Sequence, residues 1–333
     1  MRKWTFAALL LIAAGQARAV DVCPVLRNQQ SSPDPATRVA AIACNEHLIW
    51  YRPFIDREGR LASSAVTESE NTVLDDGASQ AWRRVAQYWQ ETGLLRRSQH
   101  SPGASECARA SHDRGPLPGC RAFVVDNPWS ATFVSWVLAK AGLPGFRNSA
   151  SHVDYVRDAY LRGGDNAYQY LDPARARAAV GDLLCYVRGN ERAYGYAGLV
   201  SVVQVPTGGL NMHCEIVVAT NPGGDSMAYL IGGNVQQGVT MRLLPLNRNG
   251  EFWSLPQSSG GEDTCAPDNE AACNFNRQDW AVLLKLKKSD LLAQLPRMAE
   301  FTPATVLAAP PPSCCINCVV GSGVPRCPAQ VTP

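Results

Sequence analysis

The chain has 333 residues, 46% of them hydrophobic and 18% charged, which is enough for one large domain with extensions or for two modest domains. This is the composition of a globular protein with a buried core, and it excludes a disordered or collagen-like chain. The formal net charge of +2 becomes −1 without residues 1–19, because three of the 31 basic residues and none of the 29 acidic ones lie there. A chain so close to neutral lacks the basic surface by which nucleic acids are bound, so we expect no nucleic acid partner.

Residues 1–19 have the three parts of a secretory signal peptide. Arg2 and Lys3 form its basic start, residues 6–14 its apolar run, and Ala-Arg-Ala at 17–19 a cleavage site. The apolar run is too short to span a bilayer, and no later stretch has the roughly 18 apolar residues that a spanning helix needs. We therefore expect a bacterial protein that is periplasmic or secreted, with a cleaved signal peptide and no transmembrane segment.

The twelve cysteines agree with export, because an even number of cysteines in an exported chain predicts disulfide bonds. Local spacing suggests two pairs, Cys107 with Cys120 and Cys265 with Cys273, each closing a polar loop, and Cys23 with Cys44 is a third candidate; spacing alone does not fix the pairing. The last four cysteines form a tail with a Cys-Cys-x-x-Cys run that begins at Cys314. Disulfides are favoured over a zinc site in this tail, because it lacks histidine and belongs to a chain expected in an oxidising compartment.

The first half of the chain is predicted to be mainly helical. Residues 20–75 are mixed in pattern, and we expect them to form an N-terminal extension that disulfides hold. From Ser79 the apolar residues recur at helical spacing as far as a stop at Gly93. The buried stripe of this predicted helix consists of Trp82, Val85, Tyr88 and Trp89. Residues 98–120 follow as a loop rich in serine, glycine and proline.

A second predicted helix opens at Ser130, directly after Pro128-Trp129, and ends at Gly142; a third covers residues 151–161. Apolar patterning then predicts strands over residues 181–187, 214–219, 227–231, 239–244 and 280–286. A helical half followed by an antiparallel sheet is typical of the α+β class. We expect the main domain to cover residues 76–293 and a tail rich in proline and cysteine to cover residues 294–333.

Three polar residues lie where a hydrolase needs them. Ser130 begins a predicted helix, where free backbone N–H groups and the positive end of the helix dipole favour an anionic nucleophile and an oxyanion. His213 opens a strand and can take the proton from a hydroxyl, and Asn234 ends the next strand, where an amide can orient an imidazole. Each also has a plain structural interpretation, as a helix cap, a structural histidine and a Gly-Gly-Asn turn.

Four motifs carry these residues in order along the chain. They are Pro-Trp-Ser-Ala-x-Phe-Val-Ser-Trp-Val, then Gly-Asp-Leu-Leu, then His-Cys-Glu-Ile-Val-Val, and then Ile-Gly-Gly-Asn-Val. This order resembles the CHAP and NlpC-type branch of the papain-like hydrolases, which carry a nucleophilic cysteine at the start of a helix and a histidine that opens a later strand. A closer resemblance, over roughly residues 79–286, is to the bacterial domain of unknown function 2272. Its pattern has Pro-Trp-Ser-Ala and then Phe-x-x-Ser-x-x-His-x-x-Tyr, here residues 146–155.

The resemblance implies a papain-like fold, with the nucleophile helix packed on an antiparallel sheet, and cleavage of amide bonds in peptidoglycan. It implies Ser130 as the nucleophile, His213 as the base and Asn234 as the residue that orients the imidazole. Serine replaces the cysteine of these enzymes, and a hydroxyl must lose its proton during attack whereas a thiol ionises readily beside a histidine. Three interpretations therefore stay open: a serine hydrolase, a catalytically inactive cell-wall-binding or interaction module on the same scaffold, and a disulfide-stabilised structural protein of the envelope.

Two further residues are candidates for a substrate site. Trp129 either walls a substrate groove or packs beneath its helix, and His152 either lines the cleft or lies at the surface. Side chains alternate along a strand, so His213 and Cys214 should point to opposite faces, which makes Cys214 a poor nucleophile for His213. Cys214 is then either a buried thiol or a disulfide partner of Cys185, which lies on the expected neighbouring strand. Metal-ligand spacing such as His-Glu-x-x-His does not occur in the sequence, so we expect no metal and no other cofactor.

Overall fold

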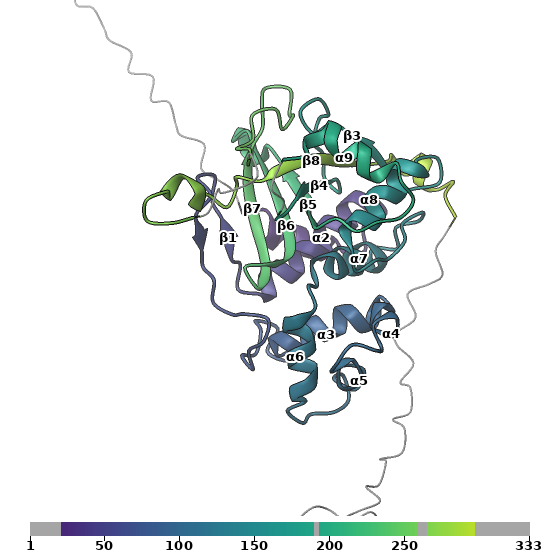
Figure 1. The fold of residues 1–333 in the computed structure, drawn as a ribbon, viewed down its shortest axis with the longest axis vertical. Coiled ribbons are helices and arrows are strands. Elements are labelled where there is room, and N and C mark those ends of the chain that lie inside the picture. The colour runs from purple at the N-terminus through teal and green to yellow at the C-terminus, as the bar shows by residue number, and fades with distance from the viewer. Residues whose placement is uncertain (1–20, 190–192, 259–264, 297–333) are drawn as a thin grey trace, which may run out of the picture.

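The computed structural model describes residues 21–189, 193–258 and 265–296. The predicted signal peptide, and the predicted tail from residue 297 onward, lie outside these residues. Figure 1 shows a β-sheet with helices packed on it and, below the sheet, a separate group of helices formed by residues 81–126. Within the described part of the chain, no helix is long and apolar enough to cross a membrane.

The sheet has eight strands in the order β2-β1-β7-β6-β5-β4-β8-β3. They are β1 (Phe54–Ile55), β2 (Leu61–Ala62), β3 (Tyr168–Leu171), β4 (Leu183–Val187), β5 (Met212–Thr220), β6 (Met227–Val235), β7 (Gly238–Pro245) and β8 (Asp279–Leu286). Strands β4 to β8 lie where the apolar patterning predicts strands, and the α+β class is confirmed. The sheet is mixed rather than antiparallel, because the short strand β1 pairs with β7 in parallel while the other neighbours are antiparallel.

Residues 21–75, the described part of the extension that the sequence predicts over residues 20–75, contribute to the sheet layer. Helix α2 (Pro35–Ile49) begins after Asp34, whose carboxylate accepts a hydrogen bond from the Thr37 N–H at 2.9 Å. It packs against β5, and β1 and β2 add one edge of the sheet. The core therefore includes residues from this segment as well as from the later part of the chain.

The predicted second and third helices are present as α7 (Ser130–Lys140) and α8 (His152–Leu161). Helix α7 packs against α2 and against strands β5 and β6, whereas α8 lies against β3 and β5 (Figure 1). Helix α9 (Gly195–Val203) contacts α8 and β8. The shorter elements are α1 (Cys23–Leu26), η1 (Arg27–Gln29), η2 (Pro222–Gly224), η3 (Glu270–Cys273) and α10 (Ser289–Leu292). Ser130 and His152 are thus the first residues of two helices that follow each other in the chain.

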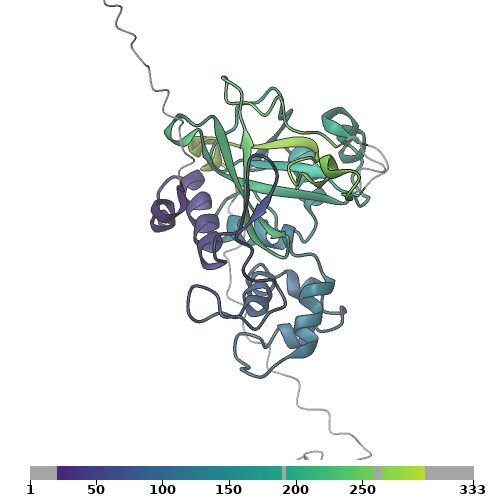
Figure 2. The same ribbon diagram turned by 90° about the vertical axis from the view of Figure 1, so that its left-hand side faces the viewer.

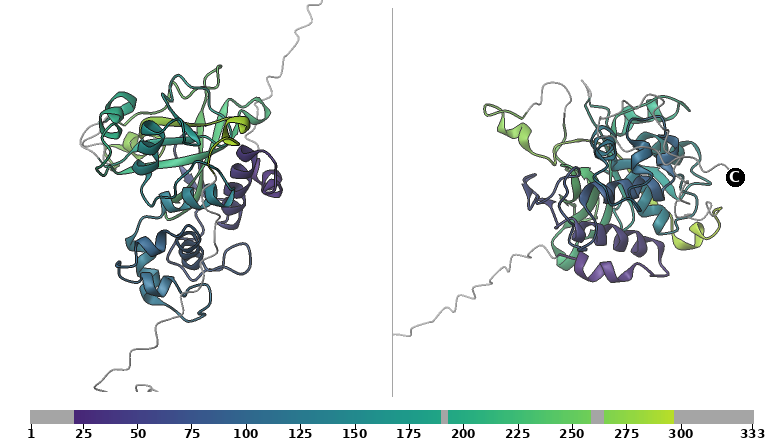
Figure 3. Two further views of the ribbon diagram at one scale, coloured as in Figure 1. Left: turned by 90° about the vertical axis from the view of Figure 1, so that its right-hand side faces the viewer. Right: turned by 90° about the horizontal axis from the view of Figure 1, so that it is seen from below.

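The helices below the sheet are α3 (Ala81–Glu91), α4 (Leu94–Arg97), α5 (Ala104–Cys107) and α6 (Pro118–Asp126). Figures 2 and 3 show this group from other directions. The predicted aromatic stripe of α3 is buried, and α3 packs against α7, which joins the two parts of the fold. Gly93, the predicted stop, has a φ of +71°, a left-handed conformation that glycine adopts at no steric cost. The predicted loop at 98–120 in fact contains α5 and the start of α6.

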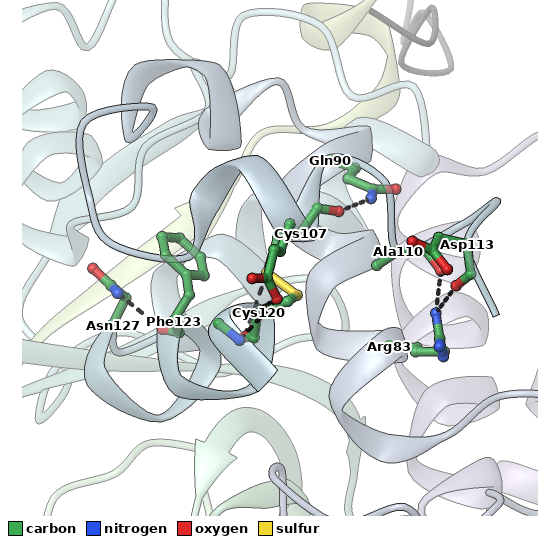
Figure 4. Close-up of a disulfide and its surroundings, with 10 residues drawn as sticks. Arg83, Gln90, Cys107, Ala110, Asp113, Cys120, Phe123 and Asn127 are labelled. Carbon is green, nitrogen blue, oxygen red and sulfur yellow. Dashed lines mark hydrogen bonds between the residues drawn. A yellow bond between two sulfur atoms is a disulfide. The ribbon is translucent and has the colours of Figure 1, made fainter. Parts of the chain in front are cut away.

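A disulfide between Cys107 and Cys120 joins α5 to α6 (Figure 4). The Gln90 side chain on α3 donates a hydrogen bond to the Cys107 carbonyl, and Arg83, also on α3, donates to the carbonyls of Ala110 and Asp113, each at 2.6 Å. These contacts fix the segment that the sequence predicts as an irregular loop. The segment is therefore held by one covalent bond and by side chains of α3.

The described residues contain four disulfides, which are Cys23–Cys44, Cys107–Cys120, Cys185–Cys214 and Cys265–Cys273. The two predicted pairs and the two candidate pairs, Cys23–Cys44 and Cys185–Cys214, are all confirmed. Cys185 and Cys214 are paired across β4 and β5 and belong to the main core, whereas Tyr186, which is paired with His213, belongs to a second apolar cluster. His213 and Cys214 therefore point to opposite faces, as predicted. Four disulfides are typical of a protein outside the reducing cytoplasm.

Candidate functional site

Ser130 is held at the N-terminus of α7 by the residues that precede it. Trp129 is the N-cap residue, and its carbonyl accepts the first hydrogen bond of the helix from Phe133 N–H at 2.8 Å. The Trp129 indole is fully buried and packs against the rings of Trp50 and Tyr88, with ring centroids 5.8 and 5.7 Å away. Trp129 therefore packs beneath the helix, and none of its surface is exposed.

The Ser130 hydroxyl is hydrogen-bonded to His152, with 2.7 Å between Oγ and Nε2. His152 begins α8, and its other ring nitrogen, Nδ1, is hydrogen-bonded to the Tyr155 hydroxyl one turn later. Ser130 is 5% exposed and His152 is 4% exposed, so this chain of three polar side chains is almost completely buried. His152 thus lies in the interior beside the serine and not at the surface.

The Phe-x-x-Ser-x-x-His-x-x-Tyr pattern has a structural explanation in these contacts. The Ser135 hydroxyl on α7 donates to the Ser149 carbonyl at 2.9 Å and accepts from the Ser149 N–H at 3.0 Å, which ties the segment before α8 to α7. The Phe146 ring packs on the Tyr155 ring with centroids 5.4 Å apart. These contacts therefore hold His152 against the start of α7, and Tyr155 supplies the hydroxyl that contacts its far nitrogen.

His213 lies next to this group without bonding to the serine. Its ring centroid is 5.1 Å from that of His152 and 5.2 Å from that of Tyr186, and the residue is 1% exposed. Neither ring nitrogen has a hydrogen-bond partner among the described residues, although Nε2 is 3.5 Å from a Glu215 carboxylate oxygen. The hydrogen bond that the resemblance implies between Ser130 and His213 is therefore made to His152, because the first turn of α8 lies against the start of α7.

Asn234 does not contact the imidazole of His213 by a hydrogen bond. Its side-chain N–H donates to a Glu68 carboxylate oxygen at 2.5 Å, and the Trp129 indole N–H donates to the same oxygen at 2.8 Å. Glu68 is 5% exposed and comes from the segment between β2 and α3. The expected orienting contact of Asn234 is thus replaced by a bridge to the residue before Ser130. Glu68 was not predictable from the sequence, because it stands in a polar stretch that matches no motif.

Burial decides the protonation state of both histidines. It lowers the pKa of His152 well below the ordinary value of 6.5, and the nearby basic groups of His213 and Arg188 lower it further. Burial also lowers the pKa of His213, although the Glu215 carboxylate opposes this shift. Both imidazoles are therefore neutral at pH 7, and a neutral imidazole can accept a proton.

Replacing Glu68 with alanine is expected to lower the free energy of unfolding by about 2 kcal/mol, because it leaves the buried Trp129 N–H and the Asn234 amide without their acceptor. Urea unfolding of the variant measures this loss. Glu68→Gln is the matched control, since its amide oxygen can still accept both hydrogen bonds. This variant should lower the free energy of unfolding by less than about 1 kcal/mol. Equal stability of the alanine variant and the wild type would show that the bridge contributes nothing.

Among the residues that the structure describes, no group of three or more histidine, cysteine, aspartate or glutamate side chains is arranged to hold a metal ion.

A family model described as "Uncharacterized protein conserved in bacteria (DUF2272)" matches residues 76–286, which is more than half of the chain. No curated protein and no solved structure matches the chain. The match includes Ser130, His152 and His213 but begins after Glu68.

Proposed function

The chain belongs to the DUF2272 family of uncharacterized bacterial proteins, and we propose that it is an exported hydrolase that cleaves amide bonds of peptidoglycan. In this proposal Ser130 is the nucleophile and His152 is its base. The observation that carries it is the 2.7 Å hydrogen bond between Ser130 Oγ and His152 Nε2 at the start of α7. A nucleophile in hydrogen-bond reach of a base that a third group orients is the arrangement shared by serine and cysteine hydrolases.

The third group in the proposal is the Tyr155 hydroxyl. When the Nδ1 proton of His152 is donated to the Tyr155 oxygen, the lone pair of Nε2 faces the Ser130 hydroxyl and can accept its proton. The first N–H groups of α7 have no carbonyl partner within the helix, so they can stabilise the negative oxygen of a tetrahedral intermediate beside Ser130. The helix start thus supplies both the nucleophile and the oxyanion site.

The proposed reaction has two halves. In the first, the bond between Ser130 Oγ and the carbonyl carbon forms while the hydroxyl proton moves to His152 Nε2, and the C–N bond then breaks as the amine leaves with that proton. In the second, water attacks the acyl carbon and gives a proton to Nε2, and the ester bond breaks as Oγ takes this proton back. Serine and histidine return to their starting states.

The substrate and the fold type are proposed from the order of the motifs. A helix that starts at the nucleophile and packs on strands β5 and β6 is compatible with a papain-like fold, and the enzymes that the motif order resembles act on the cell wall. Four disulfides and the expected signal peptide agree with a location where peptidoglycan is within reach. Peptidoglycan peptide stems contain the amide bonds that such a serine would attack.

A second candidate function is a catalytically inactive module that binds the cell wall. It is favoured by the burial of the site, since Ser130, His152 and His213 are 5%, 4% and 1% exposed. Such a module also accounts for serine in the position of the usual cysteine. It predicts that binding to peptidoglycan survives Ser130→Ala and that no amide bond is broken by either protein.

Digestion of purified peptidoglycan separates the two candidates. The mature protein should release fragments with new amino groups, and Ser130→Ala should release none, with the fragment masses identifying the bond. Thr132→Val is the matched control, because it removes another buried hydroxyl of α7 whose oxygen has no hydrogen-bond partner among the described residues. Equal release by the wild type and Ser130→Ala, or no release by the wild type, would overturn the proposed hydrolase.

A further inference from the structure

The proposed reaction does not use His213, although its ring lies 5.1 Å from that of His152. His213 is 99% buried, and its two ring nitrogens find no hydrogen-bond partner among the residues that the structure describes. A buried imidazole usually bonds at one nitrogen at least, since an unpaired polar group in the interior costs about 1–3 kcal/mol. Its position beside the Ser130–His152 pair makes His213 a candidate for a contact with the substrate.

A buried ion pair lies directly behind His213. Glu215, two residues along β5 and fully buried, accepts hydrogen bonds from Arg242 Nε on both carboxylate oxygens, at 3.0 and 2.9 Å. Arg242 on β7 is fixed in turn, because its Nη1 donates to the Phe275 carbonyl and to the Asn276 side chain. The Glu215 carboxylate is therefore held in one position, with one oxygen 3.5 Å from His213 Nε2.

Gly232 leaves room for this arrangement. A Cβ atom at residue 232 would lie 2.9 Å from both His213 Nε2 and the Glu215 Cγ, closer than packed side chains allow. The neighbouring strand β6 thus approaches the contact with backbone alone. The histidine and the carboxylate face each other without an intervening side chain from that strand.

We propose that Glu215, held by Arg242, is a positioning residue that keeps the proton of His213 on Nε2, so that Nδ1 is a hydrogen-bond acceptor for an N–H group of the substrate. A negative oxygen near Nε2 favours the tautomer with a proton there, and the opposite nitrogen then carries the lone pair. Amide and amine N–H groups are the donors that a peptide substrate offers. The assignment of a substrate N–H group to Nδ1 rests on the proposed hydrolase function, whereas the assignment of the tautomer does not.

The charges around His213 agree with this assignment. Glu215 on the same strand is the negative group that faces it, and Arg242, Arg188 and the imidazole of His152 are the basic groups nearby, with the neutral phenol of Tyr186 against its ring. Burial raises the pKa of Glu215, but Arg242 and His213 outweigh this effect and leave its pKa below the ordinary value. The carboxylate is therefore charged at neutral pH and can hold a proton on the histidine.

The test is a two-bond ¹H–¹⁵N correlation spectrum of the imidazole groups in the full mature chain. The chain has five histidines, and the spectrum of His213→Gln identifies the His213 signals. The wild type should show His213 in the Nε2–H form, and Glu215→Gln should shift its population toward the Nδ1–H form and lower its pKa. An Nδ1–H form in the wild type, or an unchanged tautomer and pKa in Glu215→Gln, would overturn the proposal.

Glu46→Gln is the matched control, because Glu46 is another fully buried carboxylate paired with an arginine, Arg84, at the α2–α3 contact. It loses a comparable ion pair and should leave the His213 signals unchanged. If Glu215→Gln does not fold, Arg242→Lys is the second variant. It keeps the positive charge but loses the guanidinium contact with both carboxylate oxygens. Part of the same shift of His213 toward the Nδ1–H form is expected. An Arg242→Lys spectrum identical to that of the wild type would then count against the proposal.

Turnover measures the second part of the proposal separately. Where peptidoglycan is cleaved, Glu215→Gln should raise KM about tenfold, the worth of one hydrogen bond, and leave kcat nearly unchanged. A drop in kcat with unchanged KM would overturn the substrate contact. Complete lack of cleavage by the wild type would overturn the proposed function instead, and the tautomer measurement would still decide the role of Glu215.

Discussion

Replacing His152 with glutamine is expected to lower kcat/KM for peptidoglycan by about 10²–10⁴-fold, the usual contribution of a general base. The reason is the geometry at Ser130, whose hydroxyl is bonded to His152 Nε2 at 2.7 Å and to no other imidazole. Glutamine can still hold the hydroxyl by a hydrogen bond, but it cannot accept the proton during attack. Release of new amino groups from purified peptidoglycan measures the effect.

His213→Gln is the comparison variant for His152→Gln. The motif order resembles enzymes in which the strand histidine is the base, whereas the hydrogen bond at Ser130 assigns that role to His152. His213→Gln should therefore lower kcat/KM only about tenfold, because it removes one hydrogen bond to the substrate. A larger loss of kcat/KM in His213→Gln than in His152→Gln would identify His213 as the base instead.

The pH dependence of the wild type follows from the burial of His152. Burial, with the nearby basic groups of His213 and Arg188, holds its pKa well below 6.5, so the base stays neutral and active as the pH falls through that value. We expect kcat/KM to be constant from pH 8 to pH 6.5 and to fall only at lower pH. An acidic limb with its midpoint at or above 6.5 would contradict the assignment of a buried His152 as the base.

Replacing Glu46 with alanine is expected to lower the free energy of unfolding by about 4 kcal/mol. The fully buried Glu46 carboxylate accepts hydrogen bonds from Arg84 Nε at 2.8 Å and from the Tyr88 hydroxyl at 2.6 Å, and so links α2 to α3. Alanine leaves the Arg84 guanidinium, 11% exposed, without its counter-ion, and breaking a buried pair from one side costs about 3–5 kcal/mol. Urea unfolding at pH 7 measures the loss.

Glu58→Ala is the control for an exposed ion pair. Its partners Arg57 and Arg60 are 72% and 74% exposed, and pairs of this kind contribute about 0–1 kcal/mol. The control should unfold within about 0.5 kcal/mol of the wild type. A similar small effect for Glu46→Ala would mean that the contact between the sheet part and the helices below it does not depend on this pair.

The parts of the fold that sequence predicted correctly depend on local patterns. The stripe of Trp82, Val85, Tyr88 and Trp89 marks α3 because residues three and four apart share one face of a helix. Strands β4 to β8 follow from apolar patterning, and the opposite directions of His213 and Cys214 follow from the alternation of a strand. Cysteine pairs such as Cys107–Cys120 were predictable because they close short loops.

The contacts that define the site were not predictable in the same way. The strand β1 pairs in parallel with β7, and the hydrogen bond from Asn234 to Glu68 joins residues 166 positions apart. No local pattern specifies such contacts, because they depend on how distant segments meet once the chain has folded. The position of His152 beside Ser130 depends likewise on the angle at which α8 packs on α7, which the spacing of the two residues does not determine.

Covalent labelling of Ser130 tests the central claim most directly, because it needs no knowledge of the substrate. The mature protein would be treated with a fluorophosphonate, which reacts with activated serine hydroxyls, and the modified peptide identified by mass spectrometry. Ser130 should be labelled in the wild type and in Thr132→Val, and its labelling should be at least about 10²-fold slower in His152→Gln. No label on Ser130, or labelling at the same rate in His152→Gln, would contradict a nucleophile that His152 activates.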